Sequence, residues 1–493
     1  MVSTGSTDGG PTGSTDGGPT GPPVSWRRIA PPAVVVAVVL TAFSNGYGYD
    51  RDELYFAMLR PAWGYVDQPS FTPLLSHAIA SVYDGGPWLL RVPATLFSLG
   101  CVVLTALLAR ELGGDGRAQA WAAWGVATTS AVLVLGHVFL TSSADLTLWP
   151  AICLCVVKAE LRLRPRWWLA AGALAGLATY NRLLVGVLVV GIALGLLLVG
   201  PRRRLVSPYV LGGAAVALLV ALPNELYQIL HGWPEADMGR ALAANNAADT
   251  RTAMLPLLVL LFGPPLVVIW VAGLVALWRD RRLRFFVVAF GLLLVFTFVG
   301  GTQPHYPVFL LPLPFAAGIV AMERHLGRVW AALFALNALV SALIAFPVLP
   351  VGTVGASPVP GVNPLVGDSV GWPAYVDQVT AAYDALPDRG SAVVVTSNYG
   401  EAGAVSRGAP DVPVFSAQNA LYDQARPPTS ATTVVVVGGQ YDQVRRLFDT
   451  CRVVDRLDNR VGVDNEEQGQ PVAVCRGPVA SWAELWPRLR HLD

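Results

Sequence analysis

The chain has 493 residues, of which 54% are hydrophobic and only 14% are charged. Soluble globular domains carry about 25% charged residues, so this composition argues against a soluble protein and is typical of repeated membrane crossing. The net charge of +1 gives no sign of a nucleic-acid partner, because the arginines lie between apolar segments rather than in one patch.

Residues 1–25 form a low-complexity segment in which Ser6–Gly13 is repeated at once as Ser14–Gly21. Gly, Pro, Ser and Thr bury too little apolar surface to offset the entropy lost on ordering. The segment is therefore predicted to be a disordered cytoplasmic tail. A signal peptide is not expected, because the first basic pair, Arg27-Arg28, follows the segment and the next apolar stretch has no small-residue cleavage site.

Apolar segments then recur up to residue 349. A helix that crosses the hydrocarbon core needs about 20 apolar residues, and some of these segments are short enough to be irregular or re-entrant. The pattern predicts a polytopic α-helical membrane domain over residues 26–349 with about eleven transmembrane helices. The segments are Ile29–Phe43, Trp88–Ala109, Ala118–Leu135, Asp145–Val157, Trp167–Tyr180, Leu183–Val199, Val206–Leu222, Met254–Trp278, Phe285–Val299, Val308–Met322 and Val329–Leu349.

Basic residues cluster in every second connection between these segments. Cytoplasmic connections carry an excess of Arg and Lys, so this set and the N-terminus are predicted to be cytoplasmic. The alternate connections, among them 45–87, 223–252 and 300–306, then face outward, as does everything after Leu349. This predicts a multi-pass plasma-membrane protein. The basic connections hold Arg27, Arg28, Arg110, Arg117, Lys158, Arg162, Arg164, Arg166, Arg202, Arg203, Arg204, Arg279, Arg281, Arg282, Arg284, Arg324 and Arg328.

Residues 350–493 are predicted to be an extracytoplasmic soluble α/β domain. Ala392–Thr396 and Thr433–Val437 have the composition of buried strands, and Val472–Cys475 is a candidate for another. A loop with glycine and a helix-like stretch follow each of the first two strands, which favours an α/β layer structure. Cys451 and Cys475 are candidates for a disulfide, because the region is predicted to lie outside the cytoplasm.

The acidic cluster Asp50–Glu53 lies just after the first apolar segment, in a long outward connection. Next comes an amphipathic stretch, Leu54–Leu59, that could lie along the membrane interface as a helix. A carboxylate at this boundary could deprotonate an acceptor hydroxyl or amine, or hold a metal ion. The alternative is that Asp52 and Glu53 only solvate the outward loop.

Further polar residues lie at the outward ends of later segments. Asp145 opens an apolar segment, and an acid at that depth indicates either function or a helix N-cap. Arg182 is a cation at a junction otherwise poor in them, which suits a lipid-linked phosphate or interfacial snorkelling. Arg240 and the segment Gln303–Tyr306 are likewise interpreted as candidates for contact with a lipid-linked phosphate or as interfacial residues. No Walker loop, HExxH motif or nucleophile elbow is present.

The order of these motifs resembles a known family. Asp52-Glu53 is followed by Tyr55, then by Gly64–Gln68 and Pro69, by Thr141–Asp145 and by Gly176–Arg182. The arrangement is similar to that of the GT-C glycosyltransferases of the protein O-mannosyltransferase and aminoarabinose-transferase type, glycosyltransferase family 39 and its relatives. The similarity covers roughly residues 30–350. Ser397–Gly403 and Glu484–His491 resemble the extra outer domain of a bacterial subgroup.

This resemblance implies sugar transfer from a polyprenyl-phosphate donor to a protein, lipid or glycan acceptor outside the cytoplasm, with inversion. Asp52 would be the general base, Glu53 its support and Asp145 the second acidic position. Relatives often have a lysine before the first-loop proline, where it contacts the donor phosphate, but here Gln68 precedes Pro69. The candidates for that phosphate contact are therefore Arg51, Arg182, Arg240 and His305.

The acceptor or sugar is expected to contact Tyr55, Asp67, Gln68 and Tyr306. The expected partners are the lipid-linked donor, the acceptor and the bilayer, without nucleic acid. No cofactor is required by the pattern, and a divalent cation stays an option.

Two other classes of protein are compatible with parts of this pattern. A transporter or flippase of a lipid-linked substrate would show internal repeats and polar residues near mid-membrane, whereas here the polar residues cluster at the outward ends. A membrane-anchored assembly factor would not need about eleven membrane segments.

Overall fold

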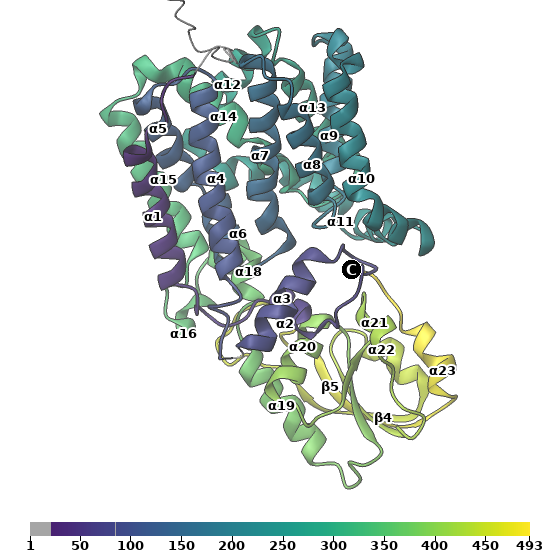
Figure 1. Cartoon of the computed structure of the whole chain (residues 1–493). Helices are drawn as coiled ribbons and strands as arrows, with labels where there is room; N and C mark the ends of the chain where they lie inside the picture. The colour runs from purple at the N-terminus through teal and green to yellow at the C-terminus, as the bar shows by residue number, and fades with distance from the viewer. Residues whose placement is uncertain (1–20, 84) are drawn as a thin grey trace, which may run out of the picture.

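The structure, a computed structural model, describes residues 21–83 and 85–493. Most of the predicted tail, residues 1–20, lies outside the described residues. A helical bundle occupies one end of the molecule, and a smaller α/β region, formed by the C-terminal part of the chain, occupies the other (Figure 1). Helices α2 and α3 lie at the junction between the two.

Most helices of the bundle overlap the predicted apolar segments, but α2 and α3 lie in the predicted connection 45–87, and α11 begins at Pro234, inside the predicted connection 223–252. Two of those segments, 118–135 and 254–278, are each divided between two helices. The bounds are α1 (Trp26–Ala42), α2 (Arg51–Met58), α3 (Phe71–Val82), α4 (Val92–Glu111), α5 (Gly116–Ala127), α6 (Ser130–His137), α7 (Thr141–Leu161), α8 (Trp167–Ala178), α9 (Val185–Leu198), α10 (Pro208–Leu230), α11 (Pro234–Phe262), α12 (Val267–Arg279), α13 (Phe285–Gly300), α14 (Pro312–Met322) and α15 (Arg328–Ala345).

Fewer helices reach full membrane-spanning length than the sequence predicts. Within residues 21–83 and 85–493, three helices are long and apolar enough to cross a bilayer, namely α4, α10 and α15. The number rises to five if the bent pairs α5–α6 and α11–α12 each form one span. The bend of 90° in the second pair falls at Gly263-Pro264-Pro265, where proline removes helical hydrogen bonds. The prediction of about eleven transmembrane helices therefore stays a prediction.

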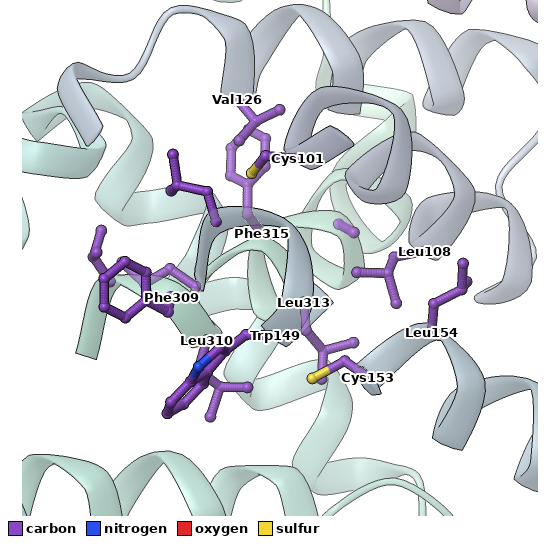
Figure 2. Close-up of a cluster of buried hydrophobic side chains, with 14 of the residues drawn as sticks. Cys101, Leu108, Val126, Trp149, Cys153, Leu154, Phe309, Leu310, Leu313 and Phe315 are labelled. Carbon is purple, nitrogen blue, oxygen red and sulfur yellow. The ribbon is translucent and has the colours of Figure 1, made fainter. Parts of the chain in front are cut away.

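The centre of the bundle is a close-packed apolar cluster. Figure 2 shows Trp149 and Cys153 of α7 beside Leu310, which lies just before α14, and Leu313, which lies at the start of α14. Trp149 is fully buried. Cys153 is a free cysteine and is also buried. Because lipid is as apolar as these side chains, complementary packing rather than the hydrophobic effect holds such helices together.

Glycines permit the closest helix contacts. A Cβ on Gly273 of α12 would come within 1.6 Å of the Pro314 carbonyl oxygen of α14, and a Cβ on Gly318 would come within 1.8 Å of the Ile269 oxygen. No side chain fits in either position. The two helices therefore depend on the missing side chains, as in other tight membrane helix pairs.

Gly273→Ala is expected to separate α12 from α14 and to cost about 1–3 kcal/mol of stability, the usual range for overpacking. Thermal unfolding in detergent should show a lower midpoint. Gly291→Ala is the matched control, because a Cβ on Gly291 of α13 meets nothing within 4 Å. Equal midpoints for the two variants would contradict the packing argument.

The α/β region has a five-stranded sheet with the order β2-β1-β3-β5-β4. Strand β1 pairs in parallel with β2 and β3, whereas β5 is antiparallel to β3 and β4. The bounds are α16 (Val351–Val354), α17 (Val359–Val362), α18 (Pro364–Gly367), α19 (Trp372–Asp384), β1 (Ala392–Thr396), α20 (Tyr399–Gly408), β2 (Val414–Ser416), α21 (Leu421–Gln424), β3 (Thr433–Val437), α22 (Tyr441–Val444), β4 (Phe448–Arg456), β5 (Pro471–Pro478) and α23 (Trp482–Leu485).

The sequence patterns locate most of this sheet. Strands β1 and β3 have the predicted bounds, and the third predicted strand lies inside β5. The helix-like stretch after β3 forms the short α22 and then a 3-10 helix, Arg445–Leu447, before β4 begins at Phe448. Cys451 and Cys475 face each other across β4 and β5 and form a disulfide.

Candidate functional site

The structure has two adjoining cavities, one where the bundle meets the α/β region and one within the bundle beside it. The first has a volume of about 580 Å³ and includes many polar side chains in its wall. The second, of about 620 Å³, is mostly apolar and is bordered by α9, α11 and α13. Their common wall consists of Asp67, Gln68, Thr141, Arg182, Met238, Leu242 and Tyr306.

Helix α2 begins with a capping box that fixes the acidic cluster. The Asp50 carboxylate accepts a hydrogen bond from the Asp52 backbone N–H (2.9 Å), and the Glu53 carboxylate accepts one from the Asp50 backbone N–H (3.0 Å). The apolar face of α2 packs against α3 and α20. The predicted amphipathic helix therefore exists, but protein covers its apolar face instead of lipid.

Glu53 forms a buried ion pair with Arg91. Both Nε and Nη2 of Arg91 lie 2.8 Å from the Glu53 carboxylate oxygens, and the Phe139 backbone N–H donates to the same carboxylate (3.0 Å). Arg91 also donates to the carbonyl oxygens of Ser44 and Gly48. Glu53 lines neither cavity. Its oxygens are taken up by structural contacts, so the predicted support for Asp52 can only be indirect.

Asp52 projects into the first cavity. Its Oδ1 accepts a hydrogen bond from the Tyr399 hydroxyl at 2.8 Å. Burial raises the pKa of Asp52, while the Tyr399 hydrogen bond and the Arg51 charge act in the opposite direction. Arg51 is itself paired with Glu466 and lies near Glu467, both from the α/β region.

Asp67 lies in the wall common to both cavities. Its Oδ2 accepts hydrogen bonds from the Tyr55 hydroxyl (3.0 Å) and from the Gln68 amide (3.4 Å). Oδ1 has no protein partner among the described residues. Burial raises the pKa of Asp67 to about 7, so this carboxyl group can act as either a donor or an acceptor near neutral pH.

Arg182 is the cation in the common wall. Its side chain contacts the hydroxyl groups of Thr141 and Ser142, and its guanidinium lies 5.0 Å from the Tyr306 ring centroid. Asp145 lies behind it, 3.7 Å from Nη1, and also accepts a hydrogen bond from Asn181 (3.2 Å). Asp145 therefore orients Arg182 from outside both cavities.

Three sequence predictions change in this part of the molecule. Asp145 is not a helix N-cap, because α7 begins at Thr141 and Leu140 occupies the cap position. His305 lines the first cavity, but burial lowers its pKa to about 3, so it is neutral and supplies no cation. Arg240 lines neither cavity; its side chain is 76% exposed and pairs with Asp237.

Two important residues were missed at the sequence level. Arg91 falls inside a predicted apolar segment, where its charge was the available signal. Tyr399 lies within Ser397–Gly403, but nothing local indicates that it reaches Asp52. Within residues 21–83 and 85–493, no group of three or more His, Cys, Asp or Glu side chains is arranged to hold a metal ion.

Comparison with known proteins shows which family and which fold this chain resembles. Residues 67–227 match the sequence model of the dolichyl-phosphate-mannose-protein mannosyltransferase family. The structure of ArnT from Cupriavidus metallidurans in the apo state aligns with a TM-score of 0.59 and 16% identity, covering 90% of this chain and 96% of ArnT. ArnT bound to undecaprenyl phosphate aligns with a TM-score of 0.55 and 15% identity, over 92% of this chain and 98% of ArnT. No curated protein sequence matches significantly.

The chain is therefore a membrane protein with the GT-C glycosyltransferase fold, and the resemblance seen in the sequence is confirmed. The alignment with ArnT covers 90% of this chain, so it extends beyond the bundle.

Glu53→Ala is expected to lower stability by about 3–5 kcal/mol, because it leaves the buried Arg91 charge without its partner. The midpoint of thermal unfolding in detergent measures the loss. Asp237→Ala is the control, since an exposed pair such as Asp237–Arg240 contributes about 0–1 kcal/mol. A Glu53→Ala midpoint equal to that of the control would contradict the structural role of this ion pair.

Proposed function

We propose that this protein is an inverting glycosyltransferase that transfers a sugar from a polyprenyl-phosphate donor to an acceptor outside the cytoplasm. The observation that carries the proposal is the pair of cavities sharing Arg182. The first cavity is the more polar of the two and holds most of the carboxylates, and the second is mostly apolar. A substrate with a sugar head, a phosphate and a hydrocarbon tail has the same three parts in the same order.

The apolar cavity suits the polyprenyl chain. Val187 and Val190 of α9 and Leu292 and Phe296 of α13 form part of its apolar wall, and Arg182 also lines it. Arginine forms paired hydrogen bonds with phosphate oxygens. The ArnT structure with undecaprenyl phosphate supports a ligand of this class. Arg182 would supply the charge that Gln68 lacks.

Asp52 is proposed to be the general base. It would take the proton from an acceptor hydroxyl while the acceptor oxygen attacks the anomeric carbon and the bond to the phosphate oxygen breaks. The leaving polyprenyl phosphate carries the negative charge, which Arg182 stabilises. A single displacement on the face opposite the phosphate inverts the anomeric centre. Asp67 and Tyr306, in the common wall, are proposed to bind the sugar or the acceptor.

A transporter or flippase is the weaker candidate. Both the family match and the fold point to transferases. The Asp52 carboxylate in the first cavity would also serve for proton abstraction, a step that transport does not need.

The first test separates binding from chemistry, using undecaprenyl phosphate as the probe. Arg182→Ala is expected to weaken its binding about 10- to 100-fold, the value of one or two charge-assisted hydrogen bonds. Native mass spectrometry of the purified protein would measure the loss. Arg240→Ala is the matched control, since that exposed side chain lines neither cavity. Equal weakening in both variants would indicate a general charge effect and reject Arg182 as the phosphate ligand.

The second test concerns Asp52. Asp52→Asn is expected to lower transfer about 100- to 10,000-fold, the usual contribution of a general base, with undecaprenyl phosphate still bound. Transfer is measured from a panel of undecaprenyl-phosphate sugars, beginning with mannose, to membranes of a deletion strain that retain the acceptor. Full transfer by a folded Asp52→Asn variant would reject this residue as the base.

The proposal also requires the α/β region to lie outside the cytoplasm. Asp411→Cys, on an exposed loop of that region, is expected to react with a membrane-impermeant maleimide in intact cells. Arg203→Cys, in the connection between α9 and α10, should react only after lysis. The native free cysteines are buried and give a low background. The reverse labelling pattern would overturn the proposed orientation.

A further inference from the structure

Tyr399 joins the two parts of the molecule at the proposed base. Its hydroxyl donates to Asp52 Oδ1 at 2.8 Å, although the two residues are 347 positions apart. The ring centroid lies 4.5 Å from that of Tyr55 and 5.1 Å from the Arg51 guanidinium. The backbone N–H of Tyr399 donates to the Gln418 side chain at 2.7 Å. These contacts fix both the backbone and the ring.

The topology of the sheet explains why a residue here can reach the cavity. The chain passes from β1 to β2 on one side of β1 and then to β3 on the other side. The carboxyl end of β1 is therefore a topological switch point, where open α/β sheets bind ligands. Tyr399 follows β1 and Gln418 follows β2, and both line the first cavity. The binding edge of the sheet thus faces the membrane domain.

Two glycines allow α20 to approach α2 closely enough for this contact. A Cβ on Gly403 would lie 2.8 Å from backbone and side-chain atoms of Leu54, and a Cβ on Gly400 would lie 3.0 Å from the Arg51 Cβ. Asn398 caps α20 and binds Glu467, which lies near Arg51. The contact between Tyr399 and Asp52 is thus built into the interface.

We propose that Tyr399 is a positioning residue for the Asp52 carboxylate, so that the C-terminal α/β region supplies part of the active site. This inference rests on the proposed function and adds a second region to its site. The hydroxyl occupies Oδ1 and fixes the orientation of the carboxylate. Oδ2 is then left to accept the proton of the acceptor.

The electrostatic surroundings make the role of Tyr399 measurable. Hydrogen bonding to an ionised carboxylate favours that form, so loss of the hydroxyl should raise the pKa of Asp52. Arg51 and Arg182 also favour the ionised form, whereas Glu53 opposes it. The other acids that interact with Asp52 are Asp50, Asp67 and Asp368. Because Arg51 is paired with Glu466, its charge does not replace the hydroxyl.

Tyr399→Phe in the full-length protein tests the proposal, with the transfer assay and donor panel given above. The acidic limb of the rate profile should move to higher pH by about 0.5–1 unit, corresponding to one hydrogen bond. The kcat should fall about 10-fold, while undecaprenyl phosphate binding stays unchanged. Tyr375→Phe is the control, because its hydroxyl binds Asn465 and Gln468 within the α/β region and lines neither cavity.

A wild-type pH profile and kcat for Tyr399→Phe would overturn the inference, as would the same shift in Tyr375→Phe. Thermal unfolding of both variants shows whether the fold is retained. If Tyr399→Phe is destabilised, Gln418→Leu takes its place. This variant should move the acidic limb of the rate profile in the same direction, because it releases the Tyr399 backbone from the Gln418 side chain. The two proposals fail separately. Full transfer by Asp52→Asn rejects the proposed base, whereas an inactive Asp52→Asn with an unshifted Tyr399→Phe rejects only the role of Tyr399.

Discussion

The buried ion pair between Arg91 and Glu53 holds together the end of the bundle that meets the α/β region. Both side chains are almost completely inaccessible to solvent, and a lone charge in such a position would be expensive. The pair is tolerated because backbone groups satisfy its remaining hydrogen bonds. Those groups come from the loop after α1, from the start of α2 and from the α6–α7 connection. One side-chain pair therefore fixes several segments that surround the cavity.

Asp52 and Glu53 show how neighbouring acids acquire different roles. Successive residues on a helix point about 100° apart. Once Glu53 is turned toward Arg91, Asp52 is turned toward the first cavity and Tyr399. The structural acid thus determines the direction of the proposed catalytic acid. The capping box adds to this effect, because it fixes the first turn of α2 at the same place.

Arg182 has a corresponding position between the polar and apolar cavities. Asp145 and hydroxyl groups of α7 hold its side chain from one side, and Tyr306 covers another. A guanidinium oriented in this way before a ligand binds loses little entropy on binding. Under the proposed function, Arg182 takes the part of the lysine that is missing before Pro69, and Asp145 acts only by orienting Arg182 from outside both cavities.

The sequence by itself determined the features that depend on local pattern. Apolar runs predicted the bundle helices, and valine-rich runs predicted β1 and β3 with their bounds. Acids and an arginine at the ends of apolar segments made Asp52, Asp145 and Arg182 candidates for function, because charged groups at a membrane boundary are costly and therefore uncommon. The order of these motifs was sufficient to suggest the GT-C fold.

Only the tertiary structure decided which of these groups act together. Glu53 changed from a catalytic candidate to a structural one because its partner, Arg91, is 38 positions away. Arg240 and His305 lost their roles as phosphate ligands because exposure and desolvation depend on surroundings that sequence spacing does not encode. Tyr399 reaches Asp52 only because the α/β region folds back onto α2. Such contacts depend on long-range packing, for which a local pattern of residues carries no signal.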